Sequence, residues 1–339
     1  MPLHISATRV SATGKRPWIA ALLAGLFVLL AACSPAQTQT PTTAQSPAES
    51  AGSPAETTRT VTDGYGEVTI PADPQRVVAA DASTFAHLVA LGIEPVAAVL
   101  PEGVPTDYFR PDGVDIPNLV AEDGWTVNLE KALELDADLI VTMYADWNIE
   151  NIERYKASPI ATYALDEGWK DIDDVYAKFR KFAADLGRSG EAEDTITAFE
   201  QKLSDGKTAL APYVADLGTV GIIRTTGDGW VGARVEDVVA TALLPGLGLQ
   251  IPDWPAANAD GYFKVEIETL EQLDVADTFL VESDEEADQL PLLKSEVWKT
   301  LTPVKNDKVI VFHAKWWNGD LLQLGSIADE IVTALTNRE

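Results

Sequence analysis

The chain has 339 residues, with 53 acidic and 25 basic side chains and a formal net charge of −28 at pH 7. Such a balance excludes nucleic-acid binding as the main function, because nucleic acids need a basic surface. A single cysteine, Cys33, excludes an internal disulfide framework.

The N-terminus has the pattern of a secretory signal. Three basic residues precede an apolar run of about twelve residues, which is short for a membrane span. Leu30-Ala31-Ala32-Cys33 then resembles the bacterial lipobox, in which the cysteine is acylated and the chain is cut just before it. We predict a lipoprotein signal peptide at 1–32 and an extracytoplasmic chain anchored to the outer face of the cell membrane by Cys33. An ordinary secretory signal with an incidental cysteine is the alternative.

Residues 33–60 have the composition of a tether. Ser, Thr, Pro, Ala, Gln and Glu dominate, and a segment with so little to bury stays disordered. About 26 such residues average roughly 30 Å end to end. Removing 1–32 leaves 22 basic and 53 acidic residues, a formal net charge of −31.

The rest of the chain alternates short β-branched runs with helical periodicity, which predicts α/β units in two lobes. The predicted strands are 76–80, 96–100, 139–143, 160–163, 220–224, 278–282 and 309–313. The predicted helices are 83–91, 129–135, 235–244, 267–273, 292–301 and 325–335.

A helical connector separates the lobes. Apolar residues at spacings of three and four predict one helix that ends at Gly187 and a second that Ser189 caps. The second helix, to Ala211, would span about 34 Å and make a stiff joint. We therefore divide the chain into an N-terminal α/β lobe at 61–170, the connector at 171–213 and a C-terminal α/β lobe at 214–339.

Several stretches resemble a known family. They are GEVTIPADPQRVVAAD at 66–81, LGIEPVAAV at 91–99, VNLEKALELDADLIV at 127–141, LGR at 186–188 and VWKTLTPVKNDKVIVF at 297–312. In these stretches the chain resembles the iron-siderophore and cobalamin-binding proteins of ABC importers, whose lobes are joined by one rigid helix. The resemblance implies a ligand cleft between two lobes, an ABC permease with its ATPase as partner, and a monomer.

Catalytic and metal motifs are missing from the sequence. It has no GxSxG, GxxxxGK[ST] or HExxH pattern, which argues against an enzyme. His87, in a predicted helix, is expected to be a half-buried packing residue. His313 ends a predicted strand without obvious partners, so no bare metal site is expected.

Aromatic side chains follow the carboxyl ends of predicted strands, where α/β proteins bind ligands. The candidate ligand-binding residues are Tyr144, Trp147, Arg224, Trp230, Tyr262, Trp316 and Trp317. Arg224 can donate to two chelating oxygens at once. Arg234 and Lys315 are weaker candidates.

The small number of cations favours a ferric hydroxamate over a ferric catecholate, which carries a net charge near minus three and needs several cations. The chelate is the ligand, and no permanently bound cofactor is expected. The resemblance also implies docking to the permease through exposed glutamates, for which Glu150, Glu153 and Glu296 are candidates.

Three alternatives stay open at this point. The same fold could hold haem or cobalamin, with His313 or Tyr262 as an axial ligand of haem. The chain could also be a surface-anchored enzyme, or a lipoprotein that binds other proteins.

Overall fold

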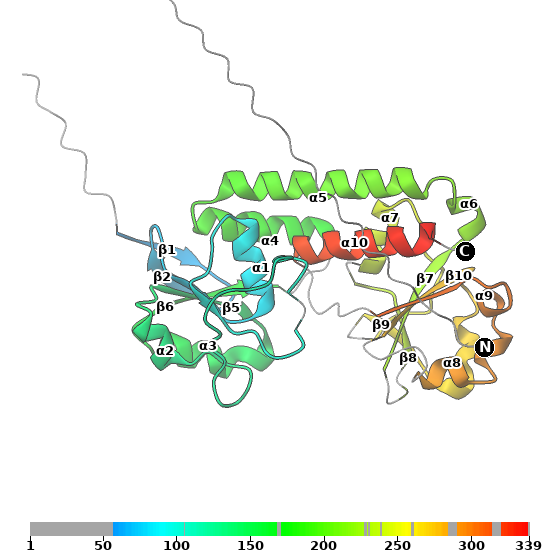
Figure 1. Cartoon of the computed structure of the whole chain (residues 1–339), viewed down its shortest axis with the longest axis horizontal. Coiled ribbons are helices and arrows are strands. Elements are labelled where there is room, and N and C mark those ends of the chain that lie inside the picture. Colours follow the sequence, from blue (N-terminus) through cyan, green and yellow to red (C-terminus); the bar gives the residue numbers. More distant parts are fainter. Residues whose placement is uncertain are drawn as a thin grey trace, which may run out of the picture. The chain divides into compact units, whose positions relative to one another are not determined.

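The computed structural model describes residues 57–104, 106–167, 171–226, 229, 231–237, 239–258, 261–283, 290–313 and 320–337. For residues 312 and 313 it describes the backbone alone. Two α/β sheets lie at the two ends of a long helix (Figure 1). This confirms the predicted fold class.

The N-terminal lobe is built on a parallel sheet in the order β4-β3-β5-β6. Its strands are β3 (Val77–Ala79), β4 (Ala97–Ala98), β5 (Leu139–Tyr144) and β6 (Ala161–Asp166). The helices are α1 (Ala82–Ala90), α2 (Leu129–Glu134), the 3-10 helix η1 (Asp146–Asn148) and α3 (Ile149–Lys156). The strands, α1 and α2 confirm the sequence predictions, whereas η1 and α3 lie where no element was predicted.

An antiparallel hairpin of β1 (Thr58–Thr62) and β2 (Glu67–Pro71) precedes this sheet. Because β1 begins at Thr58, the folded chain starts inside the stretch predicted as tether. Threonine suits a linker and a strand equally, so composition alone misplaces this boundary. The buried Asp63 holds the turn, since its carboxylate accepts hydrogen bonds from three backbone N–H groups, one of them in β6.

The connector consists of α4 (Ile172–Asp185) and α5 (Ser189–Leu210). Asp171 caps α4 by accepting from the N–H of Asp174 at 2.9 Å, and Gly187 follows the helix with a φ of +73°. The prediction that Ser189 caps the second helix is wrong, because Ser189 is its first helical residue and Arg188 stands at the cap. The 22 residues of α5 span about 33 Å.

The C-terminal lobe has a mixed sheet in the order β11-β10-β7-β8-β9. Its parallel strands, β7 (Val220–Thr225), β10 (Thr278–Ser283) and β11 (Val309–His313), confirm the predictions. The antiparallel strands β8 (Val231–Arg234) and β9 (Tyr262–Val265) were not predicted, because each has four residues without clear alternation.

The helices of this lobe are mostly short. They are α6 (Val214–Leu217), the π-helix η2 (Val239–Leu243), α7 (Leu244–Gly246), η3 (Ile267–Leu273), α8 (Pro291–Lys294), η5 (Trp298–Thr300), α9 (Thr302–Lys305) and α10 (Leu321–Thr336). The helix predicted at 292–301 is interrupted, and the one predicted at 267–273 is a 3-10 helix. Helix α10 contains the predicted helix at 325–335 and extends it by one turn at its start.

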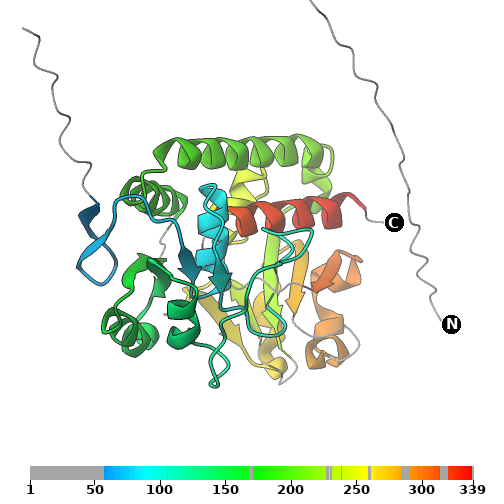
Figure 2. The same cartoon turned by 60° about the vertical axis from the view of Figure 1, so that its left-hand side comes forward.

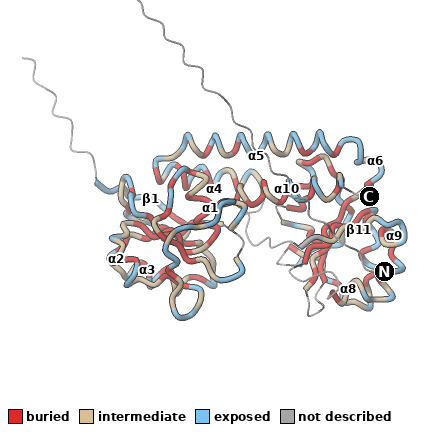
Figure 3. The backbone as a smooth tube through the Cα atoms, in the orientation of Figure 1, coloured by how far each residue is buried: buried red, intermediate tan, exposed pale blue. Residues whose placement is uncertain are grey.

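One apolar cluster joins the two lobes. Alternate residues of each sheet point into it, including Leu139 and Val141 of β5 and Val220 and Ile222 of β7. Helices α4, α5 and α10 supply its other side, and α5 and α10 lie side by side in both views (Figures 1 and 2). The opposite faces of the sheets pack into two separate clusters. The strands are accordingly the most buried part of the backbone trace (Figure 3).

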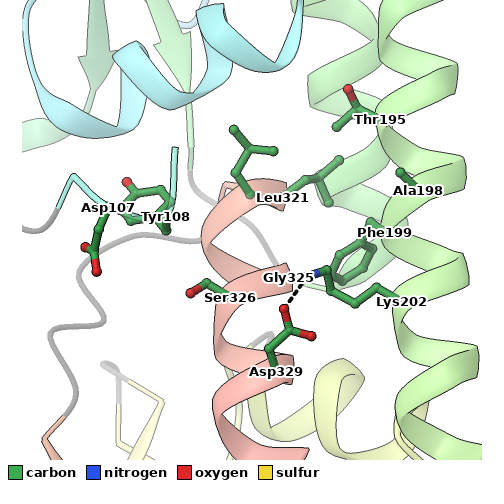
Figure 4. A pocket seen from close by; sticks show the side chains of 11 residues that line it. Asp107, Tyr108, Thr195, Ala198, Phe199, Lys202, Leu321, Gly325, Ser326 and Asp329 are labelled. Carbon is green, nitrogen blue, oxygen red and sulfur yellow. Dashed lines mark hydrogen bonds and ion pairs between the residues drawn. The ribbon is translucent and has the colours of Figure 1, made fainter. Parts of the chain in front are cut away.

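A hollow of about 420 Å³ opens along the seam between α5 and α10 (Figure 4). Phe199 and Leu321 form part of its apolar lining, and an ion pair between Lys202 and Asp329 crosses it. Further along the same seam, Gly206 allows the helices to approach. A Cβ atom there would lie 2.5 Å from Cδ2 of Leu247 and 3.0 Å from Cγ2 of Val332.

Gly206→Ala is therefore expected to destabilise the fold by about 1–3 kcal/mol, because overpacking outweighs the gain of about 1 kcal/mol in helix propensity. Urea unfolding of the chain Ser34–Glu339 measures the difference. The matched control is Gly190→Ala in the same helix, where a Cβ would meet nothing within 4 Å and where we expect no loss of stability. Equal effects of the two substitutions would contradict this account of the seam.

A buried polar cluster lies where α1 approaches the start of α10. Its members are Ser83, His87, Tyr108, Glu167 and Asp320. The Ser83 hydroxyl donates to Oε1 of Glu167 at 2.7 Å, and Nε2 of His87 lies 3.4 Å from the same oxygen. Asp320 caps α10 by accepting from the N–H of Gln323 at 2.9 Å. His87 packs against Phe179 and Phe182, as a packing residue would, but it is fully buried instead of half-buried and also contacts this polar cluster.

In and beside this cluster, the pKa values of Asp320, Asp81 and His87 are all raised. Burial raises the pKa of Asp320 to about 6 despite the nearby His87, and burial with the neighbouring Glu167 raises the pKa of Asp81 to about 7. Burial alone would lower the pKa of His87, but Glu167 and Asp320 raise it overall. Each group therefore favours its protonated form more in the folded chain than in the unfolded chain.

We expect the thermal midpoint to rise as the pH falls from 8 to about 5. A raised carboxyl pKa contributes stability that is complete below the unfolded value near 4 and is lost as the pH rises through 6 and 7. The raised pKa of His87 acts with the same sign. Asp320→Asn keeps the helix cap and should flatten this pH dependence, measured by thermal unfolding at several pH values.

Asp123→Asn is the control, because the exposed Asp123 has a lowered pKa, owing to its hydrogen bonds from Thr126 and Trp125. Its contribution disappears at pH values below its unfolded pKa, so the slope between pH 5 and 8 should not change. A wild-type slope in Asp320→Asn would show that this carboxyl does not set the pH dependence.

Candidate ligand-binding site

The N-terminal lobe has a cavity of about 440 Å³ at the carboxyl ends of its strands. Its lining comes from the ends of β3 and β5, from η1 and α3, and from the loops after β4: Ala80, Asp81, Ala82, Val99, Pro101, Val104, Trp125, Thr142, Met143, Trp147, Asn148, Asn151 and Tyr155. Two of these rings are unusually exposed for tryptophan, Trp147 by 73% and Trp125 by 64%. Large apolar rings left in solvent beside a cavity indicate a binding surface.

The polar floor of this cavity is held rigidly. Asn148 donates from Nδ2 to the Thr142 hydroxyl at 3.1 Å and to the carbonyl of Met143 at 2.7 Å. Its Oδ1 accepts from Asn151 at 2.9 Å. Asp81 caps α1 by accepting from the N–H of Thr84 at 2.8 Å. Burial and the neighbouring Glu167 raise the pKa of Asp81, so beside the neutral amides this carboxyl group favours its protonated form more than an exposed aspartate does.

Tyr144, a predicted ligand residue, does not line this cavity. Its ring lies 6.5 Å from that of Tyr65, and a Cβ on Gly64 would meet the Tyr144 side chain at 2.8 Å. The structure thus places Tyr144 against the β1–β2 turn, whereas Trp147 lines the cavity. Their nearness in sequence had suggested one surface.

The C-terminal lobe gathers charged groups at the ends of its strands. In the register of the sheet, Arg224 of β7 lies beside Glu282 of β10, and Arg234 of β8 lies opposite Tyr262 of β9. Nη1 of Arg224 donates to the Tyr262 hydroxyl at 3.3 Å, and the Arg224 side chain is 30% exposed. Predicted residues Arg224 and Tyr262 are therefore brought together.

Arg234 is buried and paired instead of exposed. Its Nε and Nη2 donate to the two oxygens of Glu282 at 2.7 and 2.9 Å, and Nη1 pairs with Asp237. Burial alone would lower the pKa of each arginine, but Glu282 with Asp237 raises it for Arg234, and Tyr262 with Glu282 raises it for Arg224. Both guanidinium groups stay charged.

Some of the other predicted residues lie outside the part of the chain that the structure describes. Trp230, Lys315, Trp316, Trp317 and the lipidation site Cys33 fall there, as does the His313 side chain. Of the predicted docking residues, Glu150 is exposed in the first turn of α3. Glu153 accepts from the Tyr65 hydroxyl at 2.8 Å, and Glu296 pairs with Lys299 at 2.6 Å. Permease docking through these glutamates stays a prediction.

Sequence reasoning missed Trp125, Asn148 and Glu282. Asp123-Gly124-Trp125 repeats the Asp-Gly-Trp triplet of residues 228–230, and the Asp123 carboxylate accepts from the N–H of Trp125 at 2.9 Å. That repetition was a usable signal. No sequence signal indicated the pairing of Glu282 with Arg234, 48 residues away, because this pairing depends on the order of the strands in the sheet.

Two absences hold for the residues that the structure describes. No group of three or more His, Cys, Asp or Glu side chains in this part of the chain could hold a metal ion. None of its helices is long and apolar enough to cross a membrane.

Similarity to known proteins identifies the family of the chain. No family model matches it. It is 30% identical to a putative ABC transporter substrate-binding lipoprotein, YhfQ of Bacillus subtilis (strain 168), over 76% of this chain and 81% of that protein. It is 28% identical to the iron(3+)-hydroxamate-binding protein FhuD of the same organism, over 72% of this chain and 75% of the relative.

The fold also resembles that of a solved substrate-binding protein. A crystal structure of a FhuD fold-family periplasmic binding protein from Bacillus subtilis superimposes with a TM-score of 0.66 at 23% identity, over 82% of this chain and all of the other. The relatives are components of transporters and not enzymes. The chain therefore belongs to the family of substrate-binding proteins of ABC transporters, and it has the FhuD fold.

Proposed function

We propose that this chain captures a ferric siderophore of the hydroxamate class outside the cell and delivers it to an ABC permease and its ATPase. The iron arrives already chelated, so it is cargo, and the chain needs no permanently bound cofactor. The lobes supply two walls, one with the exposed tryptophans and one with Arg224 and Tyr262.

The observation that carries the choice of hydroxamate is the charge of the C-terminal wall. Among the described residues of this wall, the charged side chains that pair with one another are two arginines, Arg224 and Arg234, and two carboxylates, Glu282 and Asp237. Their formal charges cancel. Lys264, on the edge strand β9, is exposed, where solvent screens its charge. A neutral ferric hydroxamate suits such a wall, whereas a trianionic catecholate would meet no excess of positive charge among these paired, described side chains.

The relatives support this choice. The Bacillus subtilis protein that is 28% identical to this chain is an iron(3+)-hydroxamate-binding protein. In the present chain, the exposed part of Arg224 and the Tyr262 hydroxyl form the donor pair that would meet the chelating oxygens.

Titration of Ser34–Glu339 with ferric chelates tests the function. We expect a ferric hydroxamate to quench tryptophan fluorescence saturably at sub-micromolar concentration, because Trp125 and Trp147 border the cavity. Arg224→Ala should weaken binding at least tenfold, about 1.4 kcal/mol. The panel also contains a ferric catecholate, haem and cobalamin, which represent the alternative ligands.

Arg180→Ala is the control, since Arg180 pairs with Glu193 on the outer surface of α4 and should not affect binding. Tight binding of the catecholate, haem or cobalamin in place of the hydroxamate would refute the ligand class. No response to any chelate would refute the capture of a siderophore.

We further propose that Cys33 is lipidated and that residues 34–57 tether the folded chain, with a mean reach of about 27 Å. Cys33→Ala should move the protein from the membrane fraction to the soluble fraction and abolish incorporation of a labelled fatty acid. Cell fractionation and labelling measure both, with the wild-type chain as reference. Unchanged membrane association of Cys33→Ala would show that another feature anchors the chain.

A further inference from the structure

The buried carboxylate of Glu282 occupies an unusual place for an acidic residue. It is 1% exposed, at the end of a central strand, and it binds the Arg234 guanidinium through both oxygens. Arg234 is 8% exposed and also pairs with Asp237. A buried ion pair gains little net stability, since the cost of removing both charges from water offsets their attraction. Stability alone is thus a weak reason for these residues.

Glu282 also lies against the group expected to meet the ligand. Its Oε1 is 3.9 Å from Nε of Arg224, its neighbour across the parallel strands. The Arg224 side chain continues to the Tyr262 hydroxyl, and the guanidinium carbon of Arg234 lies 5.4 Å from the centre of the Tyr262 ring. Four side chains from four adjacent strands therefore contact one another, and Glu282 contacts both arginines.

Glu282 contributes a buried negative charge next to the surface that a ligand meets at Arg224. The carboxylate is shielded from solvent, so salt and water screen it weakly. A neutral chelate is indifferent to this charge, whereas an anionic chelate bound at Arg224 would be repelled by it at short range. Repulsion of the wrong ligand is a common route to specificity.

We propose that Glu282 is a specificity-determining residue that excludes anionic ferric chelates from the Arg224 surface, with Arg234 holding its carboxylate in place. This inference rests on the proposed function, because it concerns the choice among ferric chelates at the same site. It assigns the selectivity to one buried carboxylate instead of to a general shortage of cations.

The test is the ratio of the dissociation constants for a trianionic ferric catecholate and a neutral ferric hydroxamate, both measured by fluorescence titration of Ser34–Glu339. Glu282→Gln keeps the shape of the side chain and raises the local charge by one. We expect the ratio to fall at least tenfold, in favour of the catecholate. A loss of structure alone would weaken both ligands and leave the ratio unchanged.

Two variants sharpen the result. Arg234→Met with Glu282→Leu removes the buried pair without changing the net charge. The ratio should still fall in this variant, because the carboxylate beside Arg224 is gone, whereas an unchanged ratio would assign the selectivity to the overall charge. Asp237→Asn raises the charge by the same unit at a carboxylate that is 23% exposed and pairs with Arg234, so a smaller fall in the ratio is expected. Thermal unfolding verifies that each variant is folded.

The outcomes are distinct. A ratio unchanged in a folded Glu282→Gln, with hydroxamate binding intact in the wild type, overturns the role of Glu282 and leaves the proposed function standing. If the wild type binds neither chelate, the proposed function is refuted, and this inference is refuted with it. If Glu282→Gln does not fold, the double variant Arg234→Met with Glu282→Leu decides, and a ratio unchanged from wild type in that folded variant counts against the proposal.

Discussion

The structure depends on one constraint, the apolar cluster that both lobes share. In many two-lobed proteins each lobe closes its own core, and the connection between them can bend. Here the inner faces of both sheets pack against α4, α5 and α10, and residues as distant as Phe85 and Leu280 belong to the same cluster. Separating the lobes would expose that cluster to water, at about 25 cal/mol for each Å² of apolar surface. Large opening is therefore costly.

This constraint explains how the candidate walls are prepared for a ligand. Trp147 stands on η1, directly after β5, and Arg224 stands on β7, and both strands send alternate residues into the shared cluster. The polar groups behind them are fixed as well, by Asn148 in one lobe and by Glu282 in the other. A site fixed in this way loses little entropy on binding, which favours affinity without a closing motion.

The sequence predicts those parts of the fold whose cause is local. Strands β5, β7 and β10 are runs of β-branched and apolar residues bounded by polar turns, and α4 has a regular apolar stripe with Asp171 at its start. Strands β1, β8 and β9 have no such signal, because their formation depends on a partner strand at the edge of a sheet.

The candidate site shows the same division. Arg224 and Trp147 could be identified, since each follows a recognisable strand. Tyr144 was grouped with Trp147 because they are three residues apart, but the residue ends its strand against the Gly64 turn, a contact made by the fold. Arg234 was a weaker candidate for binding the ligand, but its guanidinium group pairs with a carboxylate on another strand. Spacing along the chain identifies residue types well and pairings poorly.

The net charge of the chain and the buried charge of Glu282 both disfavour an anionic chelate, over different distances. The chain carries a formal net charge of −28, and the resulting field extends about one Debye length, roughly 8 Å at physiological salt. That field disfavours the approach of an anionic chelate and leaves a neutral one unaffected, but salt weakens it. The Glu282 carboxylate acts at 3.9 Å from Arg224 and away from solvent, where salt has little access. The surface charge thus affects mainly the rate of encounter, and the buried charge affects which chelate stays bound.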